Sequence, residues 1–520
     1  MWRSIKILKV IFVIPFSIGN PIKGSINTMD GSCSTRILFT CLISILTVIV
    51  GTFSGTFRYN EDSKKMKWWL IYIIVTILTI ATINIFLIFY YRNYHQFHQN
   101  NPSVETDAST KLQLRFLWIF GLGLLLRTSL SIAIDTECLV KEFSTSYISY
   151  ILSSSVLIVF MISQIGLITY MHNLRFSRSL RIYYCIGIIL LANATLWFNF
   201  TALGIASIVQ VTTANTTQSH FLSNMISVKN VSNSSNSCYT SSKIYSFAAQ
   251  LQPYLFQVSL DFFLLSTLFL VKMLPSFRYK HIQNMSNQTR TTTPRLDHRK
   301  CAIISMVMGI VFYIPLFVIS LLIRFVFFDK SYALVEAWQN IMILQKSVLL
   351  LAILFAFSHL RDLKTEMNVW RLESGDYILF SCFVGKVAIH VFEITAATFC
   401  AERKSLLFKS LISLVFYFYQ TLYIVISKRS SGTTLKHSNV SVSVHVILMT
   451  VSLTQWITTT FILSEQGHFV LNEGIGCLFQ DHFVWKMLQY ISVPFTIYYD
   501  LQSAMHFYSI LPKLRFVNHE

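Results

Sequence analysis

Charged residues are scarce in this chain, at 12% of its 520 residues. A soluble domain carries about 25% charged residues, so the composition argues against a soluble protein. Glycine and proline are also few, with 17 and 9 residues. The nine cysteines form no Cys-x-x-Cys pair and no Cys/His metal spacing. Metal-binding and redox functions are therefore disfavoured, and no cofactor is expected.

Long hydrophobic runs dominate what is present, and 53% of the residues are hydrophobic. About twelve apolar stretches are each long enough to cross a hydrocarbon core of ~30 Å. The expected spans are 36–56, 68–91, 115–135, 147–171, 183–210, 252–274, 301–327, 338–359, 377–398, 406–427, 441–463 and 484–510. The pattern predicts an all-α polytopic membrane protein with twelve transmembrane helices.

The net charge of +19 does not indicate nucleic-acid binding, because the basic residues lie in short loops beside apolar spans. Loops 172–181, 272–300 and 428–440 are basic, whereas loop 464–483 has no Lys or Arg. The positive-inside rule therefore predicts that both termini are cytoplasmic. We expect a multi-pass protein of the plasma membrane.

The spans divide into two halves of six, which would have the same orientation, as in parallel-repeat transporters. The expected segments are a cytoplasmic N-terminal segment 1–35, an N-terminal half 36–275, a basic cytoplasmic linker 276–300, a C-terminal half 301–510 and a cytoplasmic tail 511–520. The loop 211–250 contains three candidate glycosylation sites, at Asn215, Asn230 and Asn233. It lies on the expected outer side, as do Cys138, Cys238, Cys400 and Cys477, which could form disulfides.

Several polar positions occur once in each half. Gln164 in the fourth span corresponds to Gln420 in the tenth. Asn193, four residues before a tryptophan in the fifth span, corresponds to Ser452 in the eleventh. Such a weak repeat also arises by chance among apolar segments, so it becomes useful only together with further motifs.

The order of these motifs resembles that of the otopetrins, a family of proton channels. The motifs are Phe120-Gly-Leu-Gly123, Gln164, Asn193-x-x-x-Trp197, Pro253-Tyr-Leu-Phe256 with Ser259-Leu-Asp261, Gln420-Thr-Leu, Trp456, and Pro494 with Tyr498-Tyr499. The resemblance implies two six-helix halves, a homodimer with sterol at the subunit interface, and proton flow opened by external acid. Ile188, Gly204 and Asp500 depart from residues common in the family, so the chain resembles a divergent member.

A proton path needs hydrogen-bonding groups in a chain rather than a wide pore. Asp261 is the principal candidate, because an ionised Asp at membrane depth costs at least ~2.5 kcal/mol. The alternative for Asp261 is a structural carboxyl that is hydrogen-bonded to a neighbouring helix. The remaining candidates have hydroxyl or amide groups that can both donate and accept: Gln164, Asn193, Gln420, Ser452, Tyr498 and Tyr499. Interhelical hydrogen bonding is the structural alternative for the amides, and Trp197 and Trp456 are expected to pack or anchor the helices.

A charged cluster in the ninth span consists of Lys386, His390 and Glu393. Spacings of four and three place these residues on one helix face, which must line water or a partner helix. Lys386 and Glu393 could simply neutralise each other, whereas His390 could sense acid. Arg127 in the third span is another intramembrane charge, with Asp135, Glu137 or Asp261 as the expected counter-charge.

Two other classes of protein fit part of the pattern. Two parallel six-helix halves also describe a secondary active, proton-coupled solute transporter, although helices broken by Gly or Pro at matching positions would be expected there. A membrane enzyme would need a catalytic constellation at a membrane face, and the nearest pair, His390 and Glu393, lies deep within a span. The sequence therefore favours a proton channel.

Overall fold

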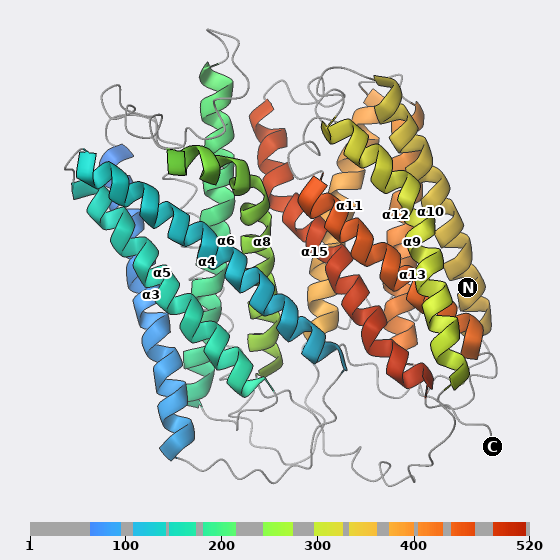
Figure 1. Ribbon diagram of the computed structural model, residues 1–520, viewed down its shortest axis with the longest axis horizontal. Helices are drawn as coiled ribbons and strands as arrows, with labels where there is room; N and C mark the ends of the chain where they lie inside the picture. Colours follow the sequence, from blue (N-terminus) through green and yellow to red (C-terminus); the bar gives the residue numbers. More distant parts are fainter. Residues whose placement is uncertain are drawn as a thin grey trace, which may run out of the picture.

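The computed structural model describes eleven stretches of the chain, and these stretches are helical (Figure 1). The described residues are 63–94, 108–141, 145–172, 180–214, 243–273, 296–325, 332–360, 374–399, 404–429, 438–462 and 482–515. Lipid offers the backbone no hydrogen-bond partner, so a membrane-spanning segment of this kind must satisfy its backbone internally, as a helix does.

The helices of the N-terminal half are α3 (Ser63–Tyr94), α4 (Ala108–Lys141), α5 (Thr145–Met171), α6 (Leu180–Ala214) and α8 (Lys243–Met273). Those of the C-terminal half are α9 (Leu296–Phe325), α10 (Tyr332–Leu360), α11 (Ser374–Phe399), α12 (Lys404–Arg429), α13 (Ser438–Ile457) with the π-helical turn η3 (Thr458–Ile462), and α15 (His482–Arg515). They coincide with the second to twelfth expected spans, and the first, 36–56, lies outside the described residues.

Ten of the described helices are long and apolar enough to cross a membrane. Their outward faces carry large apolar side chains, such as Ile304 in α9 and Leu351 in α10, which are 64% and 66% exposed. Apolar faces of this extent belong in lipid rather than in water. The prediction of an all-α polytopic membrane protein is confirmed.

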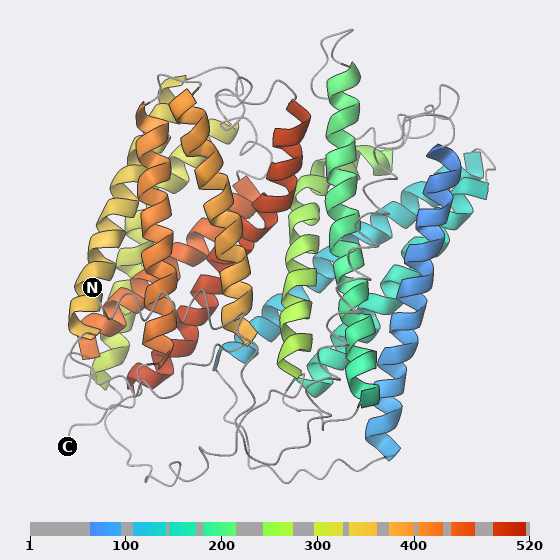
Figure 2. The same cartoon turned by 180° about the vertical axis from the view of Figure 1, so that it is seen from behind.

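The same helix pairs recur in both halves. In the N-terminal half, α3 packs against α5 and α6, α4 packs against α5 and α8, and α8 also contacts α5 and α6. In the C-terminal half, α10 packs against α12 and α13, α11 packs against α12 and α15, and α15 also contacts α12 and α13. Figure 1 shows the two groups side by side, and Figure 2 shows them from behind. The repeat inferred from a few polar residues thus has a counterpart in the packing.

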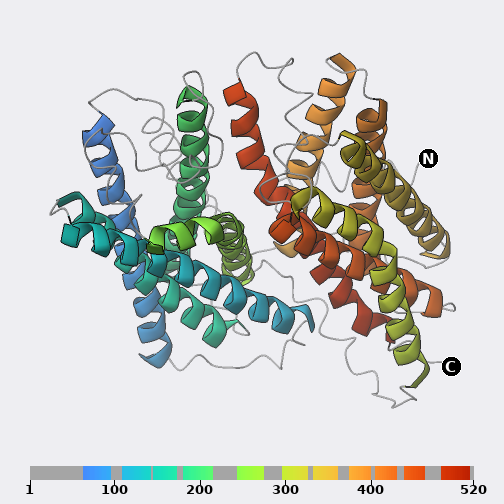
Figure 3. The ribbon, with the colours of Figure 1, turned by 45° about the horizontal axis from the view of Figure 1, so that its top comes forward.

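The last helix of each group bends along its length, as Figures 1 and 3 show for α8 and α15. Pro253 and Pro494 lie within these helices. Proline removes a backbone donor and its ring clashes with the preceding turn, which kinks a helix. Both segments nevertheless remain continuous helices.

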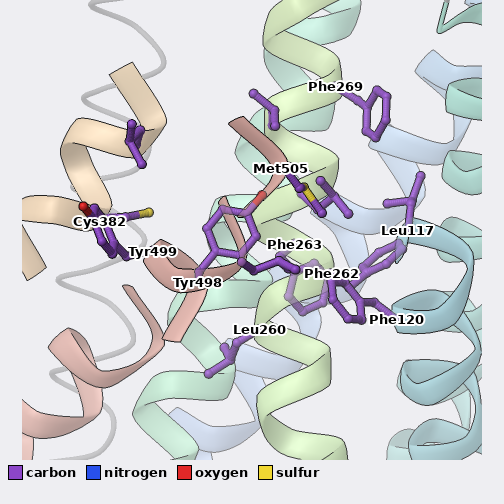
Figure 4. Packing of buried hydrophobic residues seen from close by; sticks show 14 of the residues in the cluster. Leu117, Phe120, Leu260, Phe262, Phe263, Phe269, Cys382, Tyr498, Tyr499 and Met505 are labelled. Carbon is purple, nitrogen blue, oxygen red and sulfur yellow. The ribbon is translucent and has the colours of Figure 1, made fainter. Parts of the chain in front are cut away.

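The boundary between the halves is formed by α15 against α4, α6 and α8, by α11 against α8, and by η3 against α8. Tyr498 lies in this boundary and is fully buried. Figure 4 shows its ring between Cys382 and Tyr499 on one side and Phe262 and Phe120 on the other. The boundary is therefore part of a continuous core rather than a loose contact between two bundles.

Candidate functional site

Asp261 lies in α8 at the boundary between the halves and is fully buried. Its Oδ1 accepts a hydrogen bond of 3.2 Å from Gln257 Nε2, one turn earlier in the same helix. Its Oδ2 accepts a hydrogen bond of 3.2 Å from Trp456 Nε1 in α13. The carboxyl group of Asp261 therefore joins the N-terminal half to the C-terminal half.

Trp456 is held in place by aromatic rings from both halves. Its ring centroid lies 5.7 Å from that of Phe116 and 5.8 Å from that of Phe120, both in α4. Phe461 of η3 contacts it edge-on at 6.0 Å. The sequence predicted a packing or anchoring role for Trp456, but its hydrogen bond to a carboxyl group could not be predicted, because 195 residues separate the partners.

Gln164 in α5 and Asn193 in α6 are fully buried. Among the described residues, neither amide has a hydrogen-bond partner. An unsatisfied buried polar group costs about 1–3 kcal/mol. Polar side chains within membrane spans are costly and typically face a water-filled cavity or line an ion path. The two amides therefore mark the interior of the N-terminal half as a candidate path.

Their counterparts in the C-terminal half are joined to each other. Gln420 Nε2 in α12 donates a hydrogen bond of 3.2 Å to Ser452 Oγ in α13. The corresponding amides of the N-terminal half, Gln164 and Asn193, share no such bond. The repeated positions thus have different surroundings in the two halves.

The adjacent tyrosines of α15 point in different directions. Tyr499 Oη lies 2.8 Å from Thr421 Oγ1 and donates a hydrogen bond of 3.3 Å to the carbonyl oxygen of Tyr417. Tyr498 faces the boundary, and its hydroxyl group has no partner among the described residues. Of the two tyrosines, Tyr498 is thus the one whose hydroxyl group has no partner among the described residues.

The charged cluster of α11, which consists of Lys386, His390 and Glu393, is buried. The pairing of Lys386 with Glu393, one of the alternatives that the sequence left open, does not occur. Lys386 does not neutralise Glu393; its Nζ lies 2.9 Å from Asp500 Oδ2 in α15. Glu393 instead pairs with Lys409 Nζ at 3.1 Å and with His390 Nδ1 at 3.0 Å. Lys386 and Glu393 lie two turns apart along α11. The neighbouring helices bring closer partners, Asp500 of α15 to Lys386 and Lys409 of α12 to Glu393.

Tyr417 of α12 lies at the centre of this region. The His390 ring stacks on it at 5.6 Å, and Lys386 Nζ lies 4.4 Å from its ring centroid. Lys346 Nζ of α10 lies 4.6 Å from the same centroid. Gln455 Nε2 donates a hydrogen bond of 2.9 Å to the Tyr417 hydroxyl oxygen. Sequence analysis missed Lys346, although a lone lysine in an apolar run is itself a signal of an intramembrane site.

Arg127 does not pair with any of its three expected counter-charges. Its guanidinium carbon lies 4.3 Å from the Phe200 ring centroid and 5.2 Å from that of Phe256. Cation–π contacts of this kind favour a cation that lies against aromatic faces. Of the expected partners, Glu137 pairs with Lys141 at 2.8 Å, and Asp261 is bonded as described above.

Two further groups of predicted residues concern the expected outer side. Cys138 is disulfide-bonded, as the sequence allowed, and its partner lies outside the described residues. Asn215, Asn230 and Asn233 also lie outside them. Within the described stretches, no three His, Cys, Asp or Glu side chains come together to form a metal site.

Long helices with apolar outward faces and a polar interior define a multi-pass membrane protein. A model of the otopetrin family matches residues 200–500, which is more than half of the chain. The chain belongs to the otopetrin family, a family of proton-channel type rather than an enzyme family. The matched region contains Asp261, Gln420, Ser452 and Tyr498, whereas Gln164 and Asn193 precede it. A comparison with curated proteins finds no match.

Proposed function

We propose that the protein is a proton-selective channel that passes protons down their electrochemical gradient in response to external acid. The observation that carries the proposal is the fully buried carboxyl group of Asp261 at the boundary between the halves, together with two buried amides, Gln164 and Asn193, that have no protein partner among the described residues. Membership of the otopetrin family supports the same conclusion.

Each residue has a distinct role in this proposal. Gln164 and Asn193 can both donate and accept, so they orient water in a hydrogen-bonded chain without adding a fixed charge. Asp261 takes up a proton from that chain and releases it again. Trp456 Nε1 and Gln257 Nε2 donate to the carboxyl oxygens and so hold the group in one orientation while its proton exchanges.

Whole-cell recording tests the proposal directly. The external pH is lowered from neutral to acidic while the other permeant ions are replaced. An inward current whose reversal potential follows the proton equilibrium potential is the expected result. The absence of a current in cells with the protein at their surface, or a reversal potential that ignores the proton gradient, would exclude proton selectivity.

Residue substitutions test the path within the same assay. Asp261→Asn and Gln164→Leu should each strongly reduce the acid-evoked current while surface expression persists. Glu137→Gln is the control for loss of a carboxylate, because Glu137 lies in a partly exposed ion pair with Lys141. Gln345→Leu is the control for loss of a buried amide, because Gln345 is also buried without a described partner but lies in the C-terminal half. An unchanged current in Asp261→Asn would assign Asp261 a structural role.

The proposal extends to a homodimer with sterol at the subunit interface, located in the plasma membrane with both termini cytoplasmic. Membership of the otopetrin family supports the homodimer with sterol, and the basic loops support the cytoplasmic location of both termini. Chemical crosslinking in native membranes should give a dimer, and terminal epitopes should bind antibody only after the cells are permeabilised. Labelling of either terminus in intact cells would overturn the proposed orientation.

A further inference from the structure

A cluster of acidic and basic side chains lies near one end of the C-terminal half. Glu393 of α11 accepts hydrogen bonds from three side chains, which are His390 Nδ1 at 3.0 Å, Lys409 Nζ at 3.1 Å and the Ser410 hydroxyl group. These four side chains form the acid–base cluster. Glu393 and Lys409 lie less than two turns from the C-terminal end of α11 and the N-terminal end of α12. Those ends lie on the proposed outer side.

His390 is the member of the acid–base cluster that changes charge most readily on acidification. It is 8% exposed, so part of the residue remains accessible. Its Nδ1 hydrogen is bonded to Glu393, so a second proton adds to Nε2. Lys409 already neutralises Glu393, so an imidazolium would carry a charge that no carboxylate of this cluster balances. Lys386 and Asp500 also act on the ring, but they are paired with each other.

The ring of His390 lies against Tyr417 of α12. The two rings are nearly parallel, at an angle of 15°, and their centroids are 5.6 Å apart. The ammonium groups of Lys386 and Lys346 lie 4.4 Å and 4.6 Å from the same Tyr417 centroid. A positive charge on His390 would repel these two cations, which the Tyr417 ring attracts. Protonation of His390 therefore acts directly on the contacts that position Tyr417.

Gln455 of α13 connects Tyr417 to the boundary between the halves. Its Nε2 donates a hydrogen bond of 2.9 Å to Tyr417 Oη, and its Oε1 accepts one of 2.7 Å from Lys346 Nζ. The next residue is Trp456, whose Nε1 donates to Asp261 Oδ2 at 3.2 Å. Asp261 is the buried carboxyl group of α8, which packs against α11 as α12 and α15 do. The π-helical turn η3 follows Trp456, and such turns occur frequently at functional sites. A series of contacts thus joins the acid–base cluster to the boundary.

We propose that His390 senses external acid and thereby controls the proton path at Asp261. This inference rests on the proposed proton-channel function and assigns its acid response to a site in the C-terminal half. Protonation of His390 displaces Tyr417, and the displacement passes to Gln455. Trp456 moves with Gln455, so the hydrogen bond that orients the Asp261 carboxyl group changes and the conducting state is favoured. His390 is thus a regulatory residue that lies outside the path itself.

The closing experiment measures the external pH at which the acid-evoked current is half-maximal. His390→Asn keeps an N–H donor near Glu393 but cannot be protonated, so this pH should fall by on the order of one unit. Lys409→Met removes the cation that competes with His390 for Glu393, so this pH should rise. His445→Asn is the matched control and should leave it unchanged, because His445 is a fully buried histidine of α13 whose Nδ1 lies 3.2 Å from Tyr423 Oη.

Two further variants keep the test decisive. If Lys409→Met does not reach the cell surface, Ser410→Ala removes another donor to Glu393 and should shift the half-maximal pH in the same direction. In a Gln455→Leu background, His390→Asn should cause no further shift, because the hydrogen bond to Tyr417 is lost. Unshifted values, shifts of the same sign in the His390 and Lys409 variants, or an undiminished shift in the Gln455→Leu background would overturn the proposal.

Tryptophan fluorescence separates failure of this inference from failure of the proposed function. The emission of Trp456 is obtained as the difference between the purified protein and its Trp456→Phe variant. Both carry Asp261→Asn, so that this carboxyl group does not titrate. The Trp456 emission should change on acidification, and adding His390→Asn should remove the change. A wild type without proton current would refute the proposed function, whereas an acid response that persists in His390→Asn would refute the role of His390.

Discussion

Two lysine–carboxylate pairs in this protein have almost the same length but very different surroundings. Lys386 Nζ lies 2.9 Å from Asp500 Oδ2, with side chains that are 6% and 2% exposed. Lys141 Nζ lies 2.8 Å from Glu137 Oε1, with side chains that are 42% and 28% exposed. A double-mutant cycle on each pair compares a buried Lys–Asp pair between two helices with a partly exposed Lys–Glu pair within one helix at nearly the same distance.

The buried pair should show much the larger coupling energy. At 2.9 Å and an effective dielectric constant of 20, the attraction is about 6 kcal/mol before desolvation is subtracted. Lys386→Met or Asp500→Asn alone strands the other charged group in the core, and each should cost about 3–5 kcal/mol. The double variant removes both charges and should recover most of that loss. For the exposed pair, a coupling of about 0.3–0.5 kcal/mol is expected.

The assay is the free energy of unfolding of the purified protein in mixed micelles, followed by tryptophan fluorescence during titration with a denaturing detergent. All four members of each cycle are measured under identical conditions. Similar coupling energies for the two pairs would refute the reasoning that burial decides the strength of these ion pairs. A double variant as unstable as the sum of its singles would show that Lys386 and Asp500 act independently.

Three further results are expected. Gly385→Ala should destabilise the protein by about 1–3 kcal/mol, because the new Cβ would lie 2.6 Å from Phe495 Cβ. Gly166→Ala is the control in thermal unfolding: its new Cβ would have no atom within 4 Å, so it should not destabilise the protein. Cys138→Ser should lower stability by about 2–4 kcal/mol and reduce the effect of reductant on the melting temperature. An undiminished reductant effect would contradict this. Glycosidase treatment should increase the gel mobility of the wild type but not that of a variant lacking the three sequons of loop 211–250; an unchanged wild type would rule out glycosylation there.

The helices could be predicted because their signal is local. An apolar run of membrane-spanning length predicts a helix without knowledge of its neighbours, and the second to twelfth expected spans coincide with the helices described. Burial of Asp261 and Lys386 was predictable for the same reason, since a charge within such a run avoids lipid.

The partners of these charges could not be predicted, because they lie on other helices. Lys386 and Asp500 are 114 residues apart in sequence, and only the packing of α11 against α15 brings them together. The sequence offered Glu393 as a partner because it lies on the same helix face. Hydrogen bonding at Asp261 depends in the same way on contact between α8 and the end of α13.

The π-helical turn Thr458–Ile462 follows Trp456 almost directly. A π-turn accommodates one residue more than an α-turn and rotates everything beyond it. The fifth and eleventh spans therefore match in register up to Trp197 and Trp456, and within Thr458–Ile462 an ungapped comparison assigns residues to the wrong face. Any alignment of the two halves needs a one-residue gap at this point before positions beyond Trp456 are compared with those around Gly204.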